Sequence, residues 1–348
     1  MALGLLALAC GGEVGEGAGD AGERDAGGEV GADTGGQPAV ALTSFDVAFD
    51  AEPYGAFMSV WASAPDDVYT VGGQPTVPNI EADGVVFRFD GDAWSEVEVP
   101  DGGMLNWVYG VDGETWIVGE QGRALRLVDG AFEEEYSAGV DAPLWGVWGA
   151  SADDIWAVGG DARDRNGSPV LVHWDGTAWE QVELPELDRP APALFKVWGT
   201  SATQVFAVGS QGVILAYDGE SWSQIPSGTG EDLVSLWGRA PDDIVCVGGR
   251  SNGVLGRYDG DAWSFETLQR VSGLNGSWMD EDGTAYAAGV GGRILAFAPD
   301  ATDFTEVESA TGNVLHAIFG LNGGRAYAVG GTLLSSPPYT GDVLVAER

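Results

Sequence analysis

The stretch LWGVWGASADDIWAVGG, residues 144–160, decides how the rest of the chain is interpreted. It holds two runs rich in Val, Ile and Trp, separated by the small polar segment ASADD. Because β-branched and aromatic residues fit the pleated, packed surface of a sheet, short runs of them bounded by Gly and Asp predict strands. Residues 144–160 therefore predict two β-strands joined by a tight turn.

The same pattern recurs seven times from residue 57 onward. Each unit begins with a strand that ends in an aromatic residue, and these residues are Trp61, Tyr109, Trp148, Trp198, Trp237, Trp278 and Phe319. Successive members are 48, 39, 50, 39, 41 and 41 residues apart. A second strand such as DDIWAVGG, a third such as GVILAYDG and a fourth that opens on an aromatic residue follow in six units. Four short strands in a repeat of this length are typical of a β-propeller blade.

The seventh unit supplies three strands, the last of them GDVLVAER at residues 341–348. Residues 43–50, TSFDVAFD, resemble the fourth strand of the first unit, with Phe45 in the place of Trp94. We therefore expect an all-β fold, a seven-bladed β-propeller over residues 41–348, closed by an N-terminal strand that completes the last blade. Such a closure removes the exposed edges of an open sheet.

The first ten residues, MALGLLALAC, resemble the lipobox segment of bacterial lipoproteins. That resemblance implies a signal segment at residues 1–10 and lipidation of Cys10. It also implies an extracytoplasmic, lipid-anchored protein at the outer membrane or cell surface, which Gly11 favours over the inner membrane. The segment departs from the usual pattern in lacking a Lys or Arg before the apolar run and in having Ala7 where Leu is most common. An ordinary cleaved signal peptide and a chance apolar run remain alternatives.

Residues 11–40 contain eleven Gly, seven acidic residues and no aromatic residue. A segment of this composition cannot bury a core, because it has too few apolar side chains to offset the entropy of ordering. We expect residues 11–40 to form a disordered tether between the anchor and the propeller.

The net charge of the chain is −39, from 54 acidic and 15 basic residues. Nucleic-acid binding depends on Lys and Arg side chains that neutralise phosphates, so this charge argues against a nucleic-acid partner. No internal segment approaches the roughly 20 consecutive apolar residues of a transmembrane helix. Large net charge disfavours self-association, and we expect a monomer.

The repeat consensus, with VWG, DDIWAVG and YDG elements, resembles secreted bacterial propellers with sialidase-like (BNR) and photosystem II assembly factor-like repeats. The resemblance covers residues 43–348 and implies the propeller fold. It implies little about function, because propellers of this kind include hydrolases, lyases, lectins and scaffolds. The Asp-box sequence of sialidases, Ser-x-Asp-x-Gly-x-Thr-Trp, does not occur in the chain, which argues against a sialidase active site.

Most tryptophans and many aspartates recur at fixed positions in the repeat, which predicts structural roles. Eleven of the fourteen Trp fall in three such positions and are expected in the core, whereas Trp107, Trp145 and Trp174 lie outside them. The Asp residues of the strand 1–2 and strand 3–4 turns are expected to cap backbone N–H groups. The acidic segments DARDRNG and DEDG lack the ligand spacing of a calcium loop, so calcium is a minor alternative to having no cofactor or metal.

Insertions break the repeat on one face of the expected ring. They lie in the strand 2–3 loops and the connections between blades, at residues 72–83, 159–169, 184–195 and 330–342. Binding residues concentrate on variable loops mounted on a rigid scaffold. The residues predicted to contact a ligand are Asn79, Glu81, Asp161, Arg163, Asp164, Arg165, Asn166 and Tyr339.

These observations predict a membrane-tethered binding module for a protein or a glycan. No motif of a nucleophile with its base, a zinc helix or a phosphate loop is present, which favours a protein without enzymatic activity. The alternative is a carbohydrate-active hydrolase or lyase, which would use carboxylates from several blades at the mouth of the central channel.

Overall fold

The computed structural model describes residues 42–51, 54–74, 83–136, 139–321, 324–333 and 339–347. In these residues the protein is all-β, with short 3₁₀ turns as the only helical elements. The part of the chain described here includes no helix with the length and hydrophobicity needed to cross a membrane.

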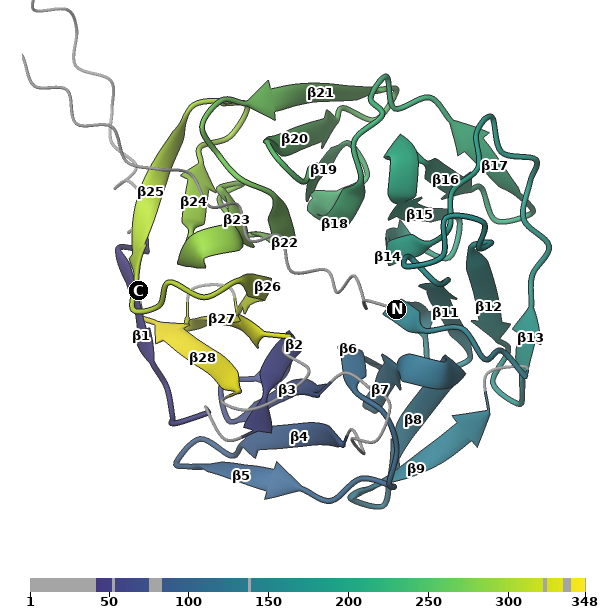
Figure 1. Ribbon diagram of the computed structural model, residues 1–348. Helices are drawn as coiled ribbons and strands as arrows, with labels where there is room; N and C mark the ends of the chain where they lie inside the picture. The colour runs from purple at the N-terminus through teal and green to yellow at the C-terminus, as the bar shows by residue number, and fades with distance from the viewer. Residues whose placement is uncertain are drawn as a thin grey trace, which may run out of the picture.

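Seven four-stranded blades surround a central axis, as the sequence predicts (Figure 1). Every blade is an antiparallel meander whose first strand lies nearest the axis and whose fourth strand lies outermost. Blades 1 to 3 contain β2 (Ala56–Ala64), β3 (Asp67–Gly73), β4 (Gly84–Phe89) and β5 (Trp94–Val97); β6 (Leu105–Val111), β7 (Glu114–Gly119), β8 (Arg123–Val128) and β9 (Ala131–Tyr136); and β10 (Leu144–Ser151), β11 (Asp154–Gly159), β12 (Val170–Trp174) and β13 (Trp179–Gln181). Blades 4 and 5 contain β14 (Leu194–Ser201), β15 (Gln204–Gly209), β16 (Ile214–Tyr217) and β17 (Trp222–Ile225); and β18 (Leu233–Ala240), β19 (Asp243–Gly248), β20 (Gly253–Tyr258) and β21 (Trp263–Leu268). Blades 6 and 7 contain β22 (Leu274–Met279), β23 (Ala285–Gly289), β24 (Ile294–Phe297) and β25 (Phe304–Ser309); and β26 (Leu315–Gly320), β27 (Ala326–Thr332), β28 (Thr340–Ala346) and β1 (Ser44–Val47).

The N-terminal strand β1 completes blade 7, which confirms the predicted closure. It pairs antiparallel with β28, with Asp46 opposite Val345. It also pairs in parallel with β25 of blade 6, with Ser44 opposite Glu308, so blades 6 and 7 form one eight-stranded sheet. The sequence pattern did not predict this second pairing, which depends on where the outer edges of two blades meet.

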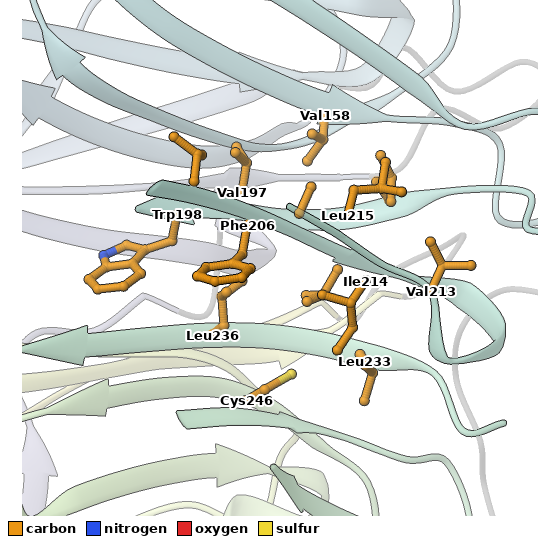
Figure 2. Packing of buried hydrophobic residues seen from close by; sticks show 14 of the residues in the cluster. Val158, Val197, Trp198, Phe206, Val213, Ile214, Leu215, Leu233, Leu236 and Cys246 are labelled. Carbon is orange, nitrogen blue, oxygen red and sulfur yellow. The ribbon is translucent and has the colours of Figure 1, made fainter. Parts of the chain in front are cut away.

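Aromatic and aliphatic side chains from facing sheets fill the space between blades. Figure 2 shows blade 4 in this setting: Phe206 lies on the side of its sheet that faces Leu236 and Cys246 of blade 5. The thiol of Cys246 is fully buried, and burial raises its pKa, as expected for an inert core cysteine.

The strand 3–4 hairpins have the predicted Asp–Gly chemistry. The Oδ1 atom of Asp175 accepts hydrogen bonds from the backbone N–H groups of Thr177 and Ala178 at 2.9 and 3.0 Å. The next residue, Gly176, has φ +92°, and a Cβ there would lie 2.7 Å from the Cβ of Asp153. Asp90, Asp218 and Asp259 accept the same pair of bonds in their own hairpins.

Three strand 1–2 turns carry adjacent aspartates, at residues 66–67, 153–154 and 242–243, and the second carboxylate of each binds a side chain instead of capping a backbone N–H group as predicted. Asp67 binds Nε of Arg88 at 2.8 Å, and Asp154 lies 2.7 Å from Nε2 of His173. Asp243 binds Nε of Arg239 at 2.5 Å. These carboxylates orient side chains of the same blade, because the turn places them beside cationic or imidazole groups.

Two of the three tryptophans outside the repeat positions are partly exposed, and one is in the core. Trp174 is buried against Trp116 and Trp179, with ring centroids 5.1 and 6.0 Å away. Its place at the end of strand 3 directs the ring toward the preceding blade. Trp107 and Trp145, on the inner strands, are partly exposed.

Candidate binding face

The strand 2–3 loops and the connections from strand 4 to the next strand 1 all lie at one end of the ring, which is called the loop face below. Blades 2, 4 and 6 make the same short 3₁₀ turn there, at Glu120–Gly122, Ser210–Gly212 and Val290–Gly292. Blade 3 instead carries residues 160–169 between β11 and β12. The predicted insertion therefore replaces a compact turn with a longer loop.

The blade 3 loop is held by its own aspartates. Oδ1 of Asp161 accepts the backbone N–H of Arg163 at 3.0 Å, and Oδ1 of Asp164 accepts that of Asn166 at 2.9 Å. The backbone N–H groups of Asp164 and Gly167 donate to the carbonyls of Asp161 and Asp164, which gives two consecutive turns. Asp and Asn side chains stabilise such turns locally, so the loop has a defined shape without a bound ion.

Arg163 links this loop to the neighbouring blade. Its Nε lies 3.2 Å from Oδ1 of Asp161, and its Nη2 lies 3.4 Å from Oε2 of Glu120 in the blade 2 turn. The Glu120 side chain is only 8% exposed, and burial raises the pKa of this carboxyl despite the nearby guanidinium. Arg163 thus joins two blades although it is exposed, as are Asp164, Arg165 and Asn166 beside it in the loop.

Of the remaining predicted contact residues, Tyr339 lies in the described part of the chain. Tyr339 is partly exposed just before β28 in blade 7, so blades 1 and 2 separate it from the blade 3 loop. Asn79, Glu81 and the predicted lipidation site Cys10 lie outside the described residues.

A second polar chain on the loop face was not predicted. Asp232, in the connection to blade 5, accepts Nε of Arg250 at 2.6 Å and the backbone N–H of Gln211 at 2.9 Å. Nη1 of Arg189 donates to the carbonyl of Gln211 at 3.3 Å. A signal was present in the sequence, because Arg163, Arg189 and Arg250 all fall in segments of one face.

Among the described residues, three exposed arginines on the loop face lack an acidic partner, whereas Arg163 and Arg250 on the same face pair with acids. Within the described ranges, no ion pair joins Arg165, Arg189 or Arg270 to a carboxylate. At the opposite end of the blades, Arg88, Arg126, Arg239 and Arg325 each pair with an acid. The loop face therefore presents three guanidinium groups that no carboxylate of the described residues neutralises directly.

The residues that the structure describes do not form a group of three or more His, Cys, Asp or Glu side chains suited to a metal ion. Asp280 in the segment DEDG accepts the backbone N–H groups of Asp282 and Thr284 at 3.1 and 2.9 Å. Both acidic segments singled out in the sequence therefore have carboxylates that stabilise their own turns.

The only lysine of the chain lies on an inner strand. Lys196 of β14 is 5% exposed, and its Nζ lies over the ring of Trp107 of blade 2. Burial lowers the pKa of this amine well below its ordinary value. Small residues at the same register, such as Gly146 on the intervening β10, leave room for these two large side chains near the axis.

Comparison with known proteins identifies the fold. No protein-family model and no curated protein sequence matches the chain. The structure is similar to YCF48 from Cyanidioschyzon merolae (TM-score 0.65, 14% identity, covering 88% of this chain and 99% of that chain) and to YCF48 bound to D1 peptide (TM-score 0.63, 13% identity, 89% and 98%). It is also similar to the extracellular domain of a hybrid two-component system from B. thetaiotaomicron (TM-score 0.60, 12% identity, 84% and 40%). At these identities the likeness shows that the chain has the β-propeller fold.

Proposed function

We propose that the protein is an extracytoplasmic binding module whose loop face recognises an acidic segment of a partner protein. The unpaired guanidinium groups of Arg165, Arg189 and Arg270 carry this proposal, because all three are exposed on one face of a strongly acidic chain. Guanidinium groups form charge-assisted, often bidentate hydrogen bonds with carboxylates. The likeness to a propeller that binds a peptide is consistent with this use of the fold.

The rigid scaffold supports such a role. The Asx turns of the blade 3 loop, the bridge from Arg163 to Glu120 and the contacts of Asp232 fix the shape of the face before any ligand arrives. A preorganised surface loses less conformational entropy on binding, so few contacts suffice for useful affinity.

In this proposal a lipid on Cys10 holds the protein at the outer membrane or cell surface, with residues 11–40 as a spacer. The spacer would keep the loop face clear of the membrane, because acidic, Gly-rich segments repel themselves and extend. Membrane fractionation of the Cys10→Ala variant tests the anchor. We expect the variant to move to the soluble fraction, and unchanged partitioning would contradict lipidation.

Binding of a Glu-rich peptide to the full chain tests the loop face. We expect the double variant Arg165→Gln/Arg270→Gln to bind it at least tenfold more weakly, and salt to weaken the wild-type complex. The matched control is Arg239→Gln/Arg325→Gln, which removes the same charge from the other end of the blades and should leave affinity within twofold.

Two results would replace the proposal. Salt-independent binding of a neutral oligosaccharide on a glycan array would identify a glycan-binding module instead. Release of reducing sugars from an oligosaccharide would favour the hydrolase or lyase alternative, with the buried carboxyl of Glu120 as the first residue to substitute.

A further inference from the structure

At several blade junctions a basic side chain lies between neighbouring sheets, where Arg126, Arg257 and Arg325 contact the adjacent blade. In four blades a basic or imidazole residue stands at one position of strand 3, opposite a residue of strand 2. In blades 1, 2, 3 and 5 the opposed pairs are Arg88 with Tyr69, Arg126 with Trp116, His173 with Trp156, and Arg257 with Val245. At the junction of blades 7 and 1 the basic residue comes from a turn, where Arg325 lies 5.5 Å from the ring of Phe89.

The junction of blades 2 and 3 shows what surrounds such a side chain. The guanidinium carbon of Arg126 lies 5.9 Å from the ring of Trp116 and 5.8 Å from that of Trp174 in the next blade. Its Nε pairs with Oε2 of Glu114 at 3.0 Å. Two aromatic faces and a carboxylate make a favourable environment for a guanidinium group. This arrangement is called the arginine cradle below.

Blades 4 and 5 keep the aromatic walls of the cradle but lack the cation. Ala216 stands opposite Phe206, at the position of Arg126. The Phe206 ring meets the rings of Tyr258 and Trp263 of blade 5 at centroid distances of 5.1 and 5.8 Å. Gln204 stands at the position of Glu114, and its amide Nε2 donates to the carbonyl of Pro241 in blade 5.

The missing side chain leaves a groove of about 600 Å³ between the outer parts of blades 4 and 5. Its walls include Phe206, Ala216, Tyr258 and Trp263, and the carboxylates of Asp218 and Asp261 lie along it. Backbone N–H groups of its hairpin lower the pKa of Asp218, so this carboxyl is ionised at neutral pH. The groove therefore combines aromatic surface with negative charge.

The other junction with a small residue at this position is covered in a different way. Ala296 of blade 6 stands opposite Tyr286, but there β1 joins the outer strands of blades 6 and 7 into one sheet. Blades 4 and 5 have separate outer strands, β17 and β21, so their junction stays open.

We propose that the groove between blades 4 and 5 receives the guanidinium group of an arginine side chain from a partner protein. The group would take the place that Arg126 fills within the chain at the junction of blades 2 and 3. This site is separate from the loop face, and its proposal stands without that of the acidic ligand. An arginine fits better than a sugar, because the internal counterparts hold planar cations and the chain carries a net charge of −39.

Titration of the full chain with N-acetyl-arginine amide tests the proposal. Binding is monitored by the NMR signals of the tryptophan indole N–H groups. The Trp263 signal should shift on saturation. The citrulline analogue, which has the same shape without the charge, should bind at least fivefold more weakly. Equal binding of both compounds, or displacement of the arginine derivative by a neutral methyl glycoside, would overturn the proposal.

The Ala216→Arg variant fills the groove from within. We expect it to weaken binding of N-acetyl-arginine amide at least tenfold and to raise the melting temperature by a few degrees, as a restored cradle should. Ala178→Arg adds the same charge at an exposed hairpin of blade 3 and should leave affinity within twofold. Unchanged affinity in a folded Ala216→Arg variant would contradict the assignment.

Asp261→Asn keeps the proposal testable if Ala216→Arg does not fold. Asp261 is exposed in a hairpin, so its replacement should leave the melting temperature unchanged while weakening arginine binding severalfold. Affinity equal to that of the wild type would show that the groove does not hold a cation.

Discussion

Trp116 of β7 and Trp179 of β13 meet edge to face across the junction of blades 2 and 3, with ring centroids 5.3 Å apart and ring planes at 89°. The same contact between a strand 2 ring and a strand 4 ring of the next blade recurs at four other junctions: Tyr69 with Phe132, Trp156 with Trp222, Phe206 with Trp263, and Tyr327 with Trp94. Aromatic pairs prefer this geometry, so these rings link neighbouring blades at five of the seven junctions.

Removal of one of these rings should weaken the whole ring of blades. Trp116 is 1% exposed, and Trp116→Ala should lower the free energy of unfolding by about 3–5 kcal/mol, because it leaves a cavity between two blades. Chemical denaturation measures this loss. The control is Trp145→Ala, which should lower the free energy of unfolding less because the Trp145 ring is partly exposed. An equal loss in both variants would contradict the special role of the junction.

The closing strand should be required for a cooperative fold. Phe45 is 1% exposed in the core of blades 6 and 7, and deletion of residues 42–52 should abolish the single cooperative melting transition. The point variant Phe45→Ala should lose about 3–5 kcal/mol. Val47 on the same strand is 59% exposed, so Val47→Ala should change stability little. An unchanged melt of the deletion variant would disprove closure by β1.

Replacement of the buried lysine should stabilise the protein. Burial lowers the pKa of Lys196 in the folded state, whereas the unfolded chain binds a proton up to about pH 10.4. Folding therefore releases a proton, and wild-type stability rises with pH toward that value. Lys196→Met should raise the free energy of unfolding at pH 7, and the gain should shrink as the pH approaches 10. A gain that is constant from pH 7 to 10 would argue against a neutral buried amine.

His316 should make the fold sensitive to mild acid. Burial lowers its pKa from 6.5 to about 4, and its Nε2 lies 3.2 Å from the carbonyl of Gly331. Between pH 6.5 and 4 the imidazole is protonated in the unfolded chain but neutral in the folded protein. The free energy of unfolding therefore falls as the pH is lowered from 6.5 to 4 and levels off below 4. The loss is up to about 3 kcal/mol. The variant His316→Gln keeps an N–H donor but does not titrate. Its free energy of unfolding relative to the wild type should therefore rise as the pH is lowered from 6.5 to 4.

Repeated local chemistry explains why so much of the fold could be predicted. The alternation of strands, the Asp–Gly hairpins and the aromatic residue in TSFDVAFD each depend on a few neighbouring residues. The candidate sites depend on partners from other blades. The pattern DARDRNG marks an insertion, but only the placement of Glu120 beside Arg163 shows which arginine of the loop pairs with a carboxylate of the next blade. Trp174 lies outside the repeat positions expected for core residues and is nevertheless in the core, because blade 2 presents Trp116 to it.

The sequence by itself determined the seven-fold repeat, the closing strand and the turns, because these follow from periodic hydrophobicity and from residues that adopt particular backbone angles. Tertiary structure alone decided which charged groups have partners. Ala216 is unremarkable within strand 3, and it marks a groove only because blade 5 sets Tyr258 and Trp263 against the space that arginine fills at other junctions. What faces a side chain across a blade junction is set by packing between distant segments, which the spacing along one chain does not encode.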